Sequence, residues 1–125
     1  MGIDEVFFFD GQPDALQLYE LFRERVMTGA HDVQIRVQKT QISFSNRHVF
    51  TCVSRLPVRK KKDMPKVYIV ITFGLCYPLE SPRINAKTEP YPNRWTHHVV
   101  VSTPEEIDEE LLSWVREAYW FALEK

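Results

Sequence analysis

The stretch Val67-Tyr68-Ile69-Val70-Ile71-Thr72-Phe73 decides the fold, because all seven of its residues are β-branched or aromatic. Such a run is typical of a strand in the middle of a sheet, with both of its faces buried. We therefore expect residues 67–73 to form the central strand of a sheet, around which the rest of the chain is arranged.

Shorter strands are predicted on both sides of this stretch. Polar and apolar residues alternate from Asp32 to Phe44, as in strands with one wet face, and a β-branched run follows at residues 49–53. After the central strand, residues 83–87 and 94–101 have the composition of two more strands. The sequence thus predicts about five or six mainly antiparallel strands between residues 32 and 101.

Two helices are predicted to bracket these strands. Apolar residues recur at helical spacing over about residues 13–28, where Pro13 suits the first turn. At the other end Thr103, Pro104 and Glu106 form a capping-box pattern, and an apolar stripe follows over about residues 104–124. Because each helix has one apolar face, we expect an α+β two-layer sandwich with both helices on one side of the sheet.

Length and composition indicate one folded domain over residues 1–125. The chain is 44% hydrophobic and 26% charged, which is ordinary for a globular protein. It has no apolar run of membrane-spanning length and no secretory signal pattern. Its two cysteines, Cys52 and Cys76, cannot form a disulfide framework. We expect a cytoplasmic protein that does not enter a membrane.

The basic run Arg59-Lys60-Lys61-Lys62 lies between Pro57 and Pro65, in a segment without apolar periodicity. This pattern predicts an exposed loop. The loop could contact phosphates, but the net charge of the chain is -1. A nucleic-acid-binding domain usually presents a basic face overall, so composition argues against a nucleic acid as the partner.

Residues 89–101 bring cations, aromatic residues and two adjacent histidines together in a loop that leads into a strand. Strand geometry would send Arg94, Thr96 and His98 to one face, and His97 to the other with its apolar neighbours. Adjacent histidines on opposite faces cannot bind one metal, and we expect no metal site. No phosphate-binding glycine loop and no recognised reaction motif is present, so neither a cofactor nor a catalytic residue is predicted.

Polar residues of the other strands fall on the same wet face as His98. If this face is concave, Arg36, Lys39, Arg94 and His98 could converge as donors to an anionic ligand, with Tyr91 or Tyr68 as a stacking wall. The alternative is a solvated face with cross-strand ion pairs, which needs no functional explanation.

Four segments resemble a family of uncharacterised bacterial domains, DUF5655. These segments are residues 37–44, 73–75, 81–84 and 89–99, and the string Arg94-Trp95-Thr96-His97-His98 is the most specific of them. The similarity extends from Phe8 through the last helix. It implies no established activity, substrate or cofactor, although some members are labelled as predicted transport proteins. Because this chain has no membrane segment, we do not expect a transport mechanism.

The resemblance also implies a shared pocket, since several polar residues fall in the family's signature segments. The leading hypothesis is a cytoplasmic, non-catalytic binding or interaction module for a small anionic ligand or a protein segment. One alternative is a small enzyme that uses His97 or His98 as a general acid or base. The other is a homodimeric assembly module. The candidate ligand-binding residues are Lys39, Arg83, Tyr91, Arg94, Thr96, His97 and His98.

Overall fold

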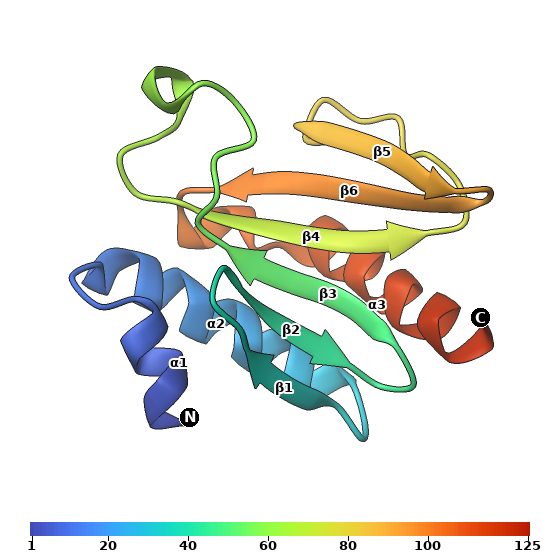
Figure 1. The fold of residues 1–125 in the computed structure, drawn as a ribbon, viewed down its shortest axis with the longest axis horizontal. Helices are drawn as coiled ribbons and strands as arrows, with labels where there is room; N and C mark the ends of the chain where they lie inside the picture. The colour runs from blue at the N-terminus through green and yellow to red at the C-terminus, as the bar shows by residue number, and fades with distance from the viewer.

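The computed structural model describes residues 1–125 and consists of a six-stranded antiparallel sheet with helices on one of its faces (Figure 1). The predicted α+β class is therefore confirmed. The helices are α1 (Ile3–Phe8), α2 (Pro13–Gly29) and α3 (Glu109–Glu124). The strands are β1 (Gln34–Val37), β2 (Gln41–Ser45), β3 (Val49–Ser54), β4 (Ile69–Leu75), β5 (Ala86–Tyr91) and β6 (Arg94–Val101).

The strand order is β1-β2-β3-β4-β6-β5, so that β4 lies inside the sheet as predicted. Strands β1 to β4 follow one another as a meander, whereas β5 and β6 form a hairpin that joins β4 through β6. Asn93 has a φ of 61° in the turn of this hairpin, a conformation that asparagine tolerates better than most residues. The central pair β4 and β6 is in register from Ile69 opposite Val101 to Leu75 opposite Trp95.

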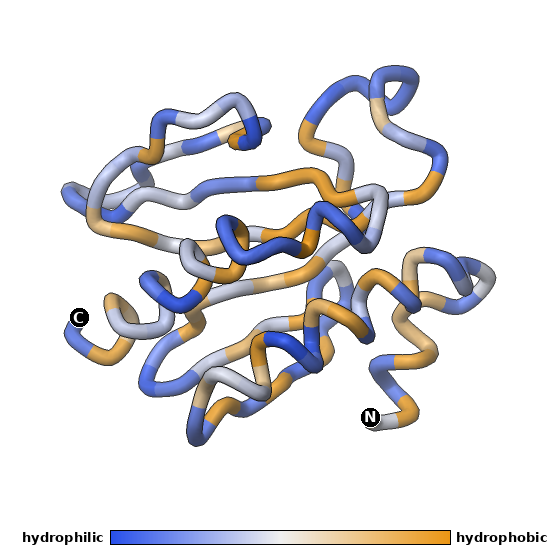
Figure 2. The backbone as a smooth tube through the Cα atoms, turned by 180° about the vertical axis from the view of Figure 1, so that it is seen from behind, coloured by the Kyte–Doolittle hydropathy of each residue, from blue (hydrophilic) through white to orange (hydrophobic).

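The main core lies between the sheet and the helices. Ile69, Ile71 and Phe73 point from β4 toward this side and are at most 1% exposed. The apolar faces of α2 and α3 pack against the sheet, and Figure 2 shows the helix layer from behind with α2 between α1 and α3. Alternation along the strands therefore places one face of the sheet in the core.

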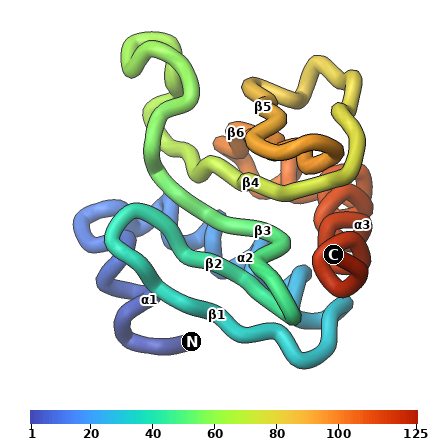
Figure 3. The backbone as a smooth tube through the Cα atoms, turned by 45° about the vertical axis from the view of Figure 1, so that its right-hand side comes forward, coloured from blue at the N-terminus to red at the C-terminus, as the bar shows by residue number.

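The other face of the sheet, called the open face here, has no helix over it. Its only separate apolar cluster is formed by Tyr68, Val70 and Val100, against which Val58 and Met64 pack from the loop after β3. This loop stands out from one end of the sheet in Figures 1 and 3. The central strand is thus buried on both faces only near its start, because Thr72 and Gly74 on the open face are partly exposed.

Several boundaries differ from the sequence-based expectations. The strand predicted at residues 67–73 begins and ends two residues later, and the one predicted at residues 83–87 is displaced to residues 86–91. The capping box at Thr103 exists, but it starts a single 3-10 turn, and α3 begins after a second cap at Asp108. The short helix α1 was not predicted, because its apolar residues mostly face outward.

Candidate functional site

Strand β6 directs its two histidines to opposite faces of the sheet, as predicted. His97 lies opposite Phe73 on the helix side, and His98 lies opposite Thr72 on the open face. His97 has 0% exposure, whereas His98 is partly exposed. The two side chains therefore have separate environments and separate chemistry.

His97 is fixed inside the core. Its ring stacks on Phe73 with centroids 5.1 Å apart, and its Nε2 accepts a hydrogen bond of 3.0 Å from the backbone N–H of Leu79. Burial is the largest influence on the pKa of His97 and lowers it. A neutral imidazole that accepts at Nε2 carries its proton on Nδ1, and this buried N–H has no hydrogen-bond partner.

Lys87, the residue opposite His97 on β5, also binds the backbone of Leu79. Lys87 lies opposite His97, and its Nζ donates 2.9 Å to the Leu79 carbonyl and 2.8 Å to Glu80. Both backbone polar groups of Leu79, its N–H and its C=O, are thus bound by side chains of β5 and β6. The expectation that His97 contacts a ligand needs correction, because its side chain is buried and anchors the β4–β5 loop.

His98 belongs to a row of polar side chains across the open face. The register aligns Arg36, Ser43, Cys52, Thr72 and His98 on five adjacent strands. The Thr72 Oγ1 lies 2.8 Å from the His98 Nδ1, and burial lowers the pKa of His98. Burial also raises the pKa of Cys52, which is 9% exposed. The row therefore presents a neutral imidazole and a protonated thiol at neutral pH.

The other predicted ligand-binding residues do not converge on His98. Arg83 is engaged on the helix side, where it donates to Asp108 at 2.8 Å and to Glu110 at 3.0 Å. Lys39 lies in the turn between β1 and β2, at least three strand spacings from β6, which is roughly 14 Å or more. The predicted convergence of Lys39 and Arg83 with His98 is therefore wrong.

Tyr91, Arg94 and Thr96 remain on the side of the β5–β6 hairpin. Tyr91 and Arg94 flank its turn and are exposed, and Thr96 is partly exposed on the same strand and face as His98. Along β6, Arg94 and His98 are four residues apart, or about 13 Å. A role for these residues in ligand binding stays a prediction, and none of the three lines either of the two hollows described below.

The largest concentration of unpaired positive charge lies in residues 55–68, called the basic arch here. Six cations occur in it, with Asp63 as the one acid: Arg55, Arg59, Lys60, Lys61, Lys62 and Lys66. None of the six takes part in a salt bridge, although five such pairs occur elsewhere in the molecule. Their positive charge is consequently not neutralised within the chain.

Arg55 is held rigidly at the base of the arch. Its Nε donates 2.9 Å to the Tyr68 carbonyl, and its guanidinium lies 4.5 Å from the centre of the Tyr68 ring. The Tyr68 hydroxyl in turn donates 2.8 Å to the Arg55 carbonyl, and Gln12 accepts a further hydrogen bond from the guanidinium. A guanidinium fixed in this way loses little conformational freedom when it binds an anion.

The arch borders an open-sided hollow of about 540 Å³. Three cations line it, with no carboxylate among the lining residues: Arg55, Pro57, Lys61, Met64, Pro65, Lys66 and Tyr68. Sequence reasoning identified the basic run but interpreted it as a solvated loop. Lys66 was noted beside this run, and the missed signal was Arg55, a cation on the other side of the loop bounded by prolines.

No three histidine, cysteine, aspartate or glutamate side chains lie close enough together to bind a metal ion. None of the helices has the length and apolar character needed to cross a membrane.

Comparison with known proteins places the chain in a family. The family described as a domain of unknown function (DUF5655) matches residues 5–122, and the chain belongs to it. No curated protein and no solved structure matches the chain. The match includes all six strands, α2 and all but the last two residues of α3, so the basic arch and the histidine strand lie inside the family's domain.

Proposed function

We propose that the protein is a non-catalytic binding module for a small anionic ligand and that the ligand binds in the basic arch. The observation that carries this proposal is the hollow lined by Arg55, Lys61 and Lys66, in which no cation is neutralised by a carboxylate. Charge-assisted hydrogen bonds from such donors are suited to phosphate and carboxylate groups. The prearranged Arg55 would supply the geometry, and the two lysines would supply further charge.

We further propose that the protein is cytoplasmic. Both cysteines are free, one buried and one exposed, which suits a reducing compartment. The net charge of -1 favours a compact anion over a polymer such as a nucleic acid.

Calorimetric titration with inorganic phosphate and with pyrophosphate tests the proposal. We expect binding that weakens as salt is raised and that falls about tenfold in Lys61→Gln, since one charged hydrogen bond is lost. Lys62→Gln is the matched control, because Lys62 is exposed on the same loop and does not line the hollow. The proposal fails if neither anion binds at millimolar concentration, or if Lys61→Gln and Lys62→Gln weaken binding equally.

A second candidate function is favoured by one contact on the open face. The Thr72 hydroxyl and the His98 Nδ1 are 2.8 Å apart, the geometry of a hydroxyl beside a general base. Neutral His98 could accept a proton from Thr72, whereas the buried His97 cannot reach a substrate. A screen with hydrolase and transferase substrates would test this candidate, and activity that survives in His98→Gln would eliminate it.

A further inference from the structure

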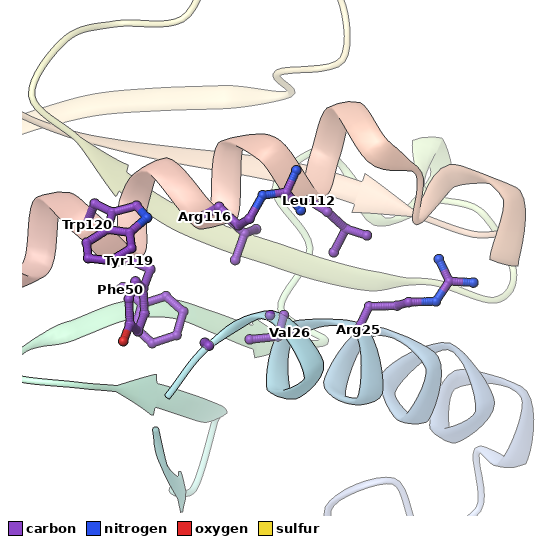
Figure 4. A pocket seen from close by; sticks show the side chains of 10 residues that line it. Arg25, Val26, Phe50, Leu112, Arg116, Tyr119 and Trp120 are labelled. Carbon is purple, nitrogen blue, oxygen red and sulfur yellow. The ribbon is translucent and has the colours of Figure 1, made fainter. Parts of the chain in front are cut away.

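A groove between α2 and α3 forms an apolar surface on the outside of the helix layer (Figure 4). Its floor consists of the buried residues Val26, Phe50, Leu112 and Val115. Trp120 stands beside it with 61% of its surface exposed. The free space is only about 30 Å³, which suits the end of one apolar side chain better than a complete small molecule.

The charges along this groove have one sign. Arg25 and Arg116 line it, and no carboxylate is among the lining residues. Arg116 is paired with Glu109 in its own helix, whereas Arg25 takes part in no salt bridge. The groove therefore fits a segment that combines an apolar side chain with a nearby carboxylate.

Helix α1 of this same chain is such a segment. Ile3, Val6 and Phe7 are 74%, 42% and 66% exposed and lie on one face of the helix, at spacings of three and four residues. Asp4 is exposed beside them and takes part in no salt bridge, and the first ten residues contain no lysine or arginine. Helix α1 thus matches the groove in both apolar character and charge.

The same helix is fixed in place from its inner side. Glu5 is only 4% exposed, and it accepts hydrogen bonds from the Tyr19 hydroxyl and, at 2.8 Å, from the Arg23 Nε. Both partners belong to α2. Because this polar contact holds α1 against α2, its outer apolar face is presented in a defined orientation without being buried in its own molecule.

We propose that α1 of one copy of this chain binds in the α2–α3 groove of a second copy, reciprocally, in a two-fold symmetric dimer. Since α2 lies between α1 and α3 in the helix layer (Figure 2), a two-fold axis roughly parallel to α2 turns each α1 toward the α2–α3 side of the partner. Phe7 or Ile3 would fill the groove, and Asp4 would lie near the unpaired Arg25. The basic arch is outside this contact, so the dimer does not depend on the proposed anion binding.

Sedimentation velocity over a range of protein concentrations tests the dimer. We expect a monomer–dimer equilibrium, in which Phe7→Glu weakens the dimer about 100-fold because two apolar anchors are lost. Asp4→Arg and Arg25→Glu should each weaken it about tenfold, since both symmetric contacts become repulsive. Lys62→Glu, an equal charge change at an exposed position of the basic arch, is the matched control and should have no effect.

The decisive measurement is the double variant Asp4→Arg with Arg25→Glu, which exchanges the two charges and should restore the dimer to within about threefold of the original. Far-ultraviolet circular dichroism of each variant separates loss of the contact from loss of folding. A monomer at the highest concentration, an open polymer, or a dimer that is indifferent to these charge changes would overturn the proposal. Phosphate binding that persists in Phe7→Glu would separate this contact from the basic arch.

Discussion

The two faces of the sheet differ most clearly at neighbouring residues of β6. On the helix side His97 stacks on Phe73 and has no contact with solvent, whereas on the open face His98 shares a hydrogen bond with Thr72 and is partly exposed. The difference shows that residue type alone does not assign function. Of two adjacent histidines on one strand, His97 has a structural role, whereas His98 is accessible.

The largest expected difference between the faces concerns neighbouring residues of β4. Phe73→Ala should lower the free energy of unfolding by about 3–5 kcal/mol, because it opens a cavity between His97 and Trp114. Thr72→Ala on the open face should lower it by no more than about 1 kcal/mol. Urea unfolding of both variants measures the contrast, and equal losses would contradict the assignment of the core to one face.

A smaller difference is expected between the two histidines. His97→Phe keeps an aromatic ring but leaves the Leu79 N–H without an acceptor, at a cost of about 1–3 kcal/mol. His98→Phe leaves only the Thr72 hydroxyl without its partner, and this group can bind water. Thermal unfolding of the two variants compares them. A greater loss in His98→Phe would reverse the roles assigned here.

The pH dependence of stability should reflect the histidine on each face of the sheet. Burial lowers the pKa of His97 and of His98, so below about pH 6.5 the unfolded chain binds protons that the folded chain does not. Stability is therefore retained above this pH and falls as the pH drops from about 7 to 5, by at most about 1.4 kcal/mol per pH unit for each histidine.

The variants His97→Gln and His98→Gln measure how much each residue contributes to this dependence of stability on pH. Each should flatten the dependence of the free energy of unfolding on pH, because one of the titrating groups is gone. Urea titrations between pH 5 and 8 give the slopes. If the slope is unchanged in both variants, the pH dependence arises from the carboxylates and not from these histidines.

The smallest expected effect leaves stability unchanged and concerns thiol reactivity. Cys52 belongs to the open face but is buried by its neighbours, and burial raises its pKa, whereas Cys76 is exposed. Mass spectrometry after brief treatment with iodoacetamide should find Cys76 modified first, because alkylation needs an accessible thiolate. Equal labelling would mean that the open face is more accessible than the structure shows.

Local patterns predicted the long elements well. The helical spacing after Pro13 and the alternation from Asp32 gave α2 and β1 within two residues, and the alternation around His97 assigned both faces of β6 correctly. These features follow from side-chain period, which is a local property. Helix α1 was missed because its attachment to α2 depends on the buried Glu5, a polar residue that no apolar pattern reveals.

The proposed pocket was predicted less well, because its geometry depends on contacts between residues that are far apart in the sequence. Two residues on the wet face of a sheet can lie on strands that are far apart. The strand order places Lys39 several strands away from β6. Arg83 has two acidic partners at the start of α3, which lie 25 and 27 residues away in the chain. Conversely, Arg55 and Lys66 come together only because the basic arch folds back over Tyr68.

The strand order has a consequence for how the molecule comes apart. The meander β1–β4 and the hairpin β5–β6 meet along a single seam between β4 and β6, and α3, which follows β6 in the chain, packs back over β3 and β4. Helix α3 thus adds a second connection between the β1–β4 meander and the β5–β6 hairpin, which the sheet joins only through the pairing of β4 with β6. Amide protons along this seam should exchange slowest with deuterium, and a chain that ends before α3 should lose protection there first.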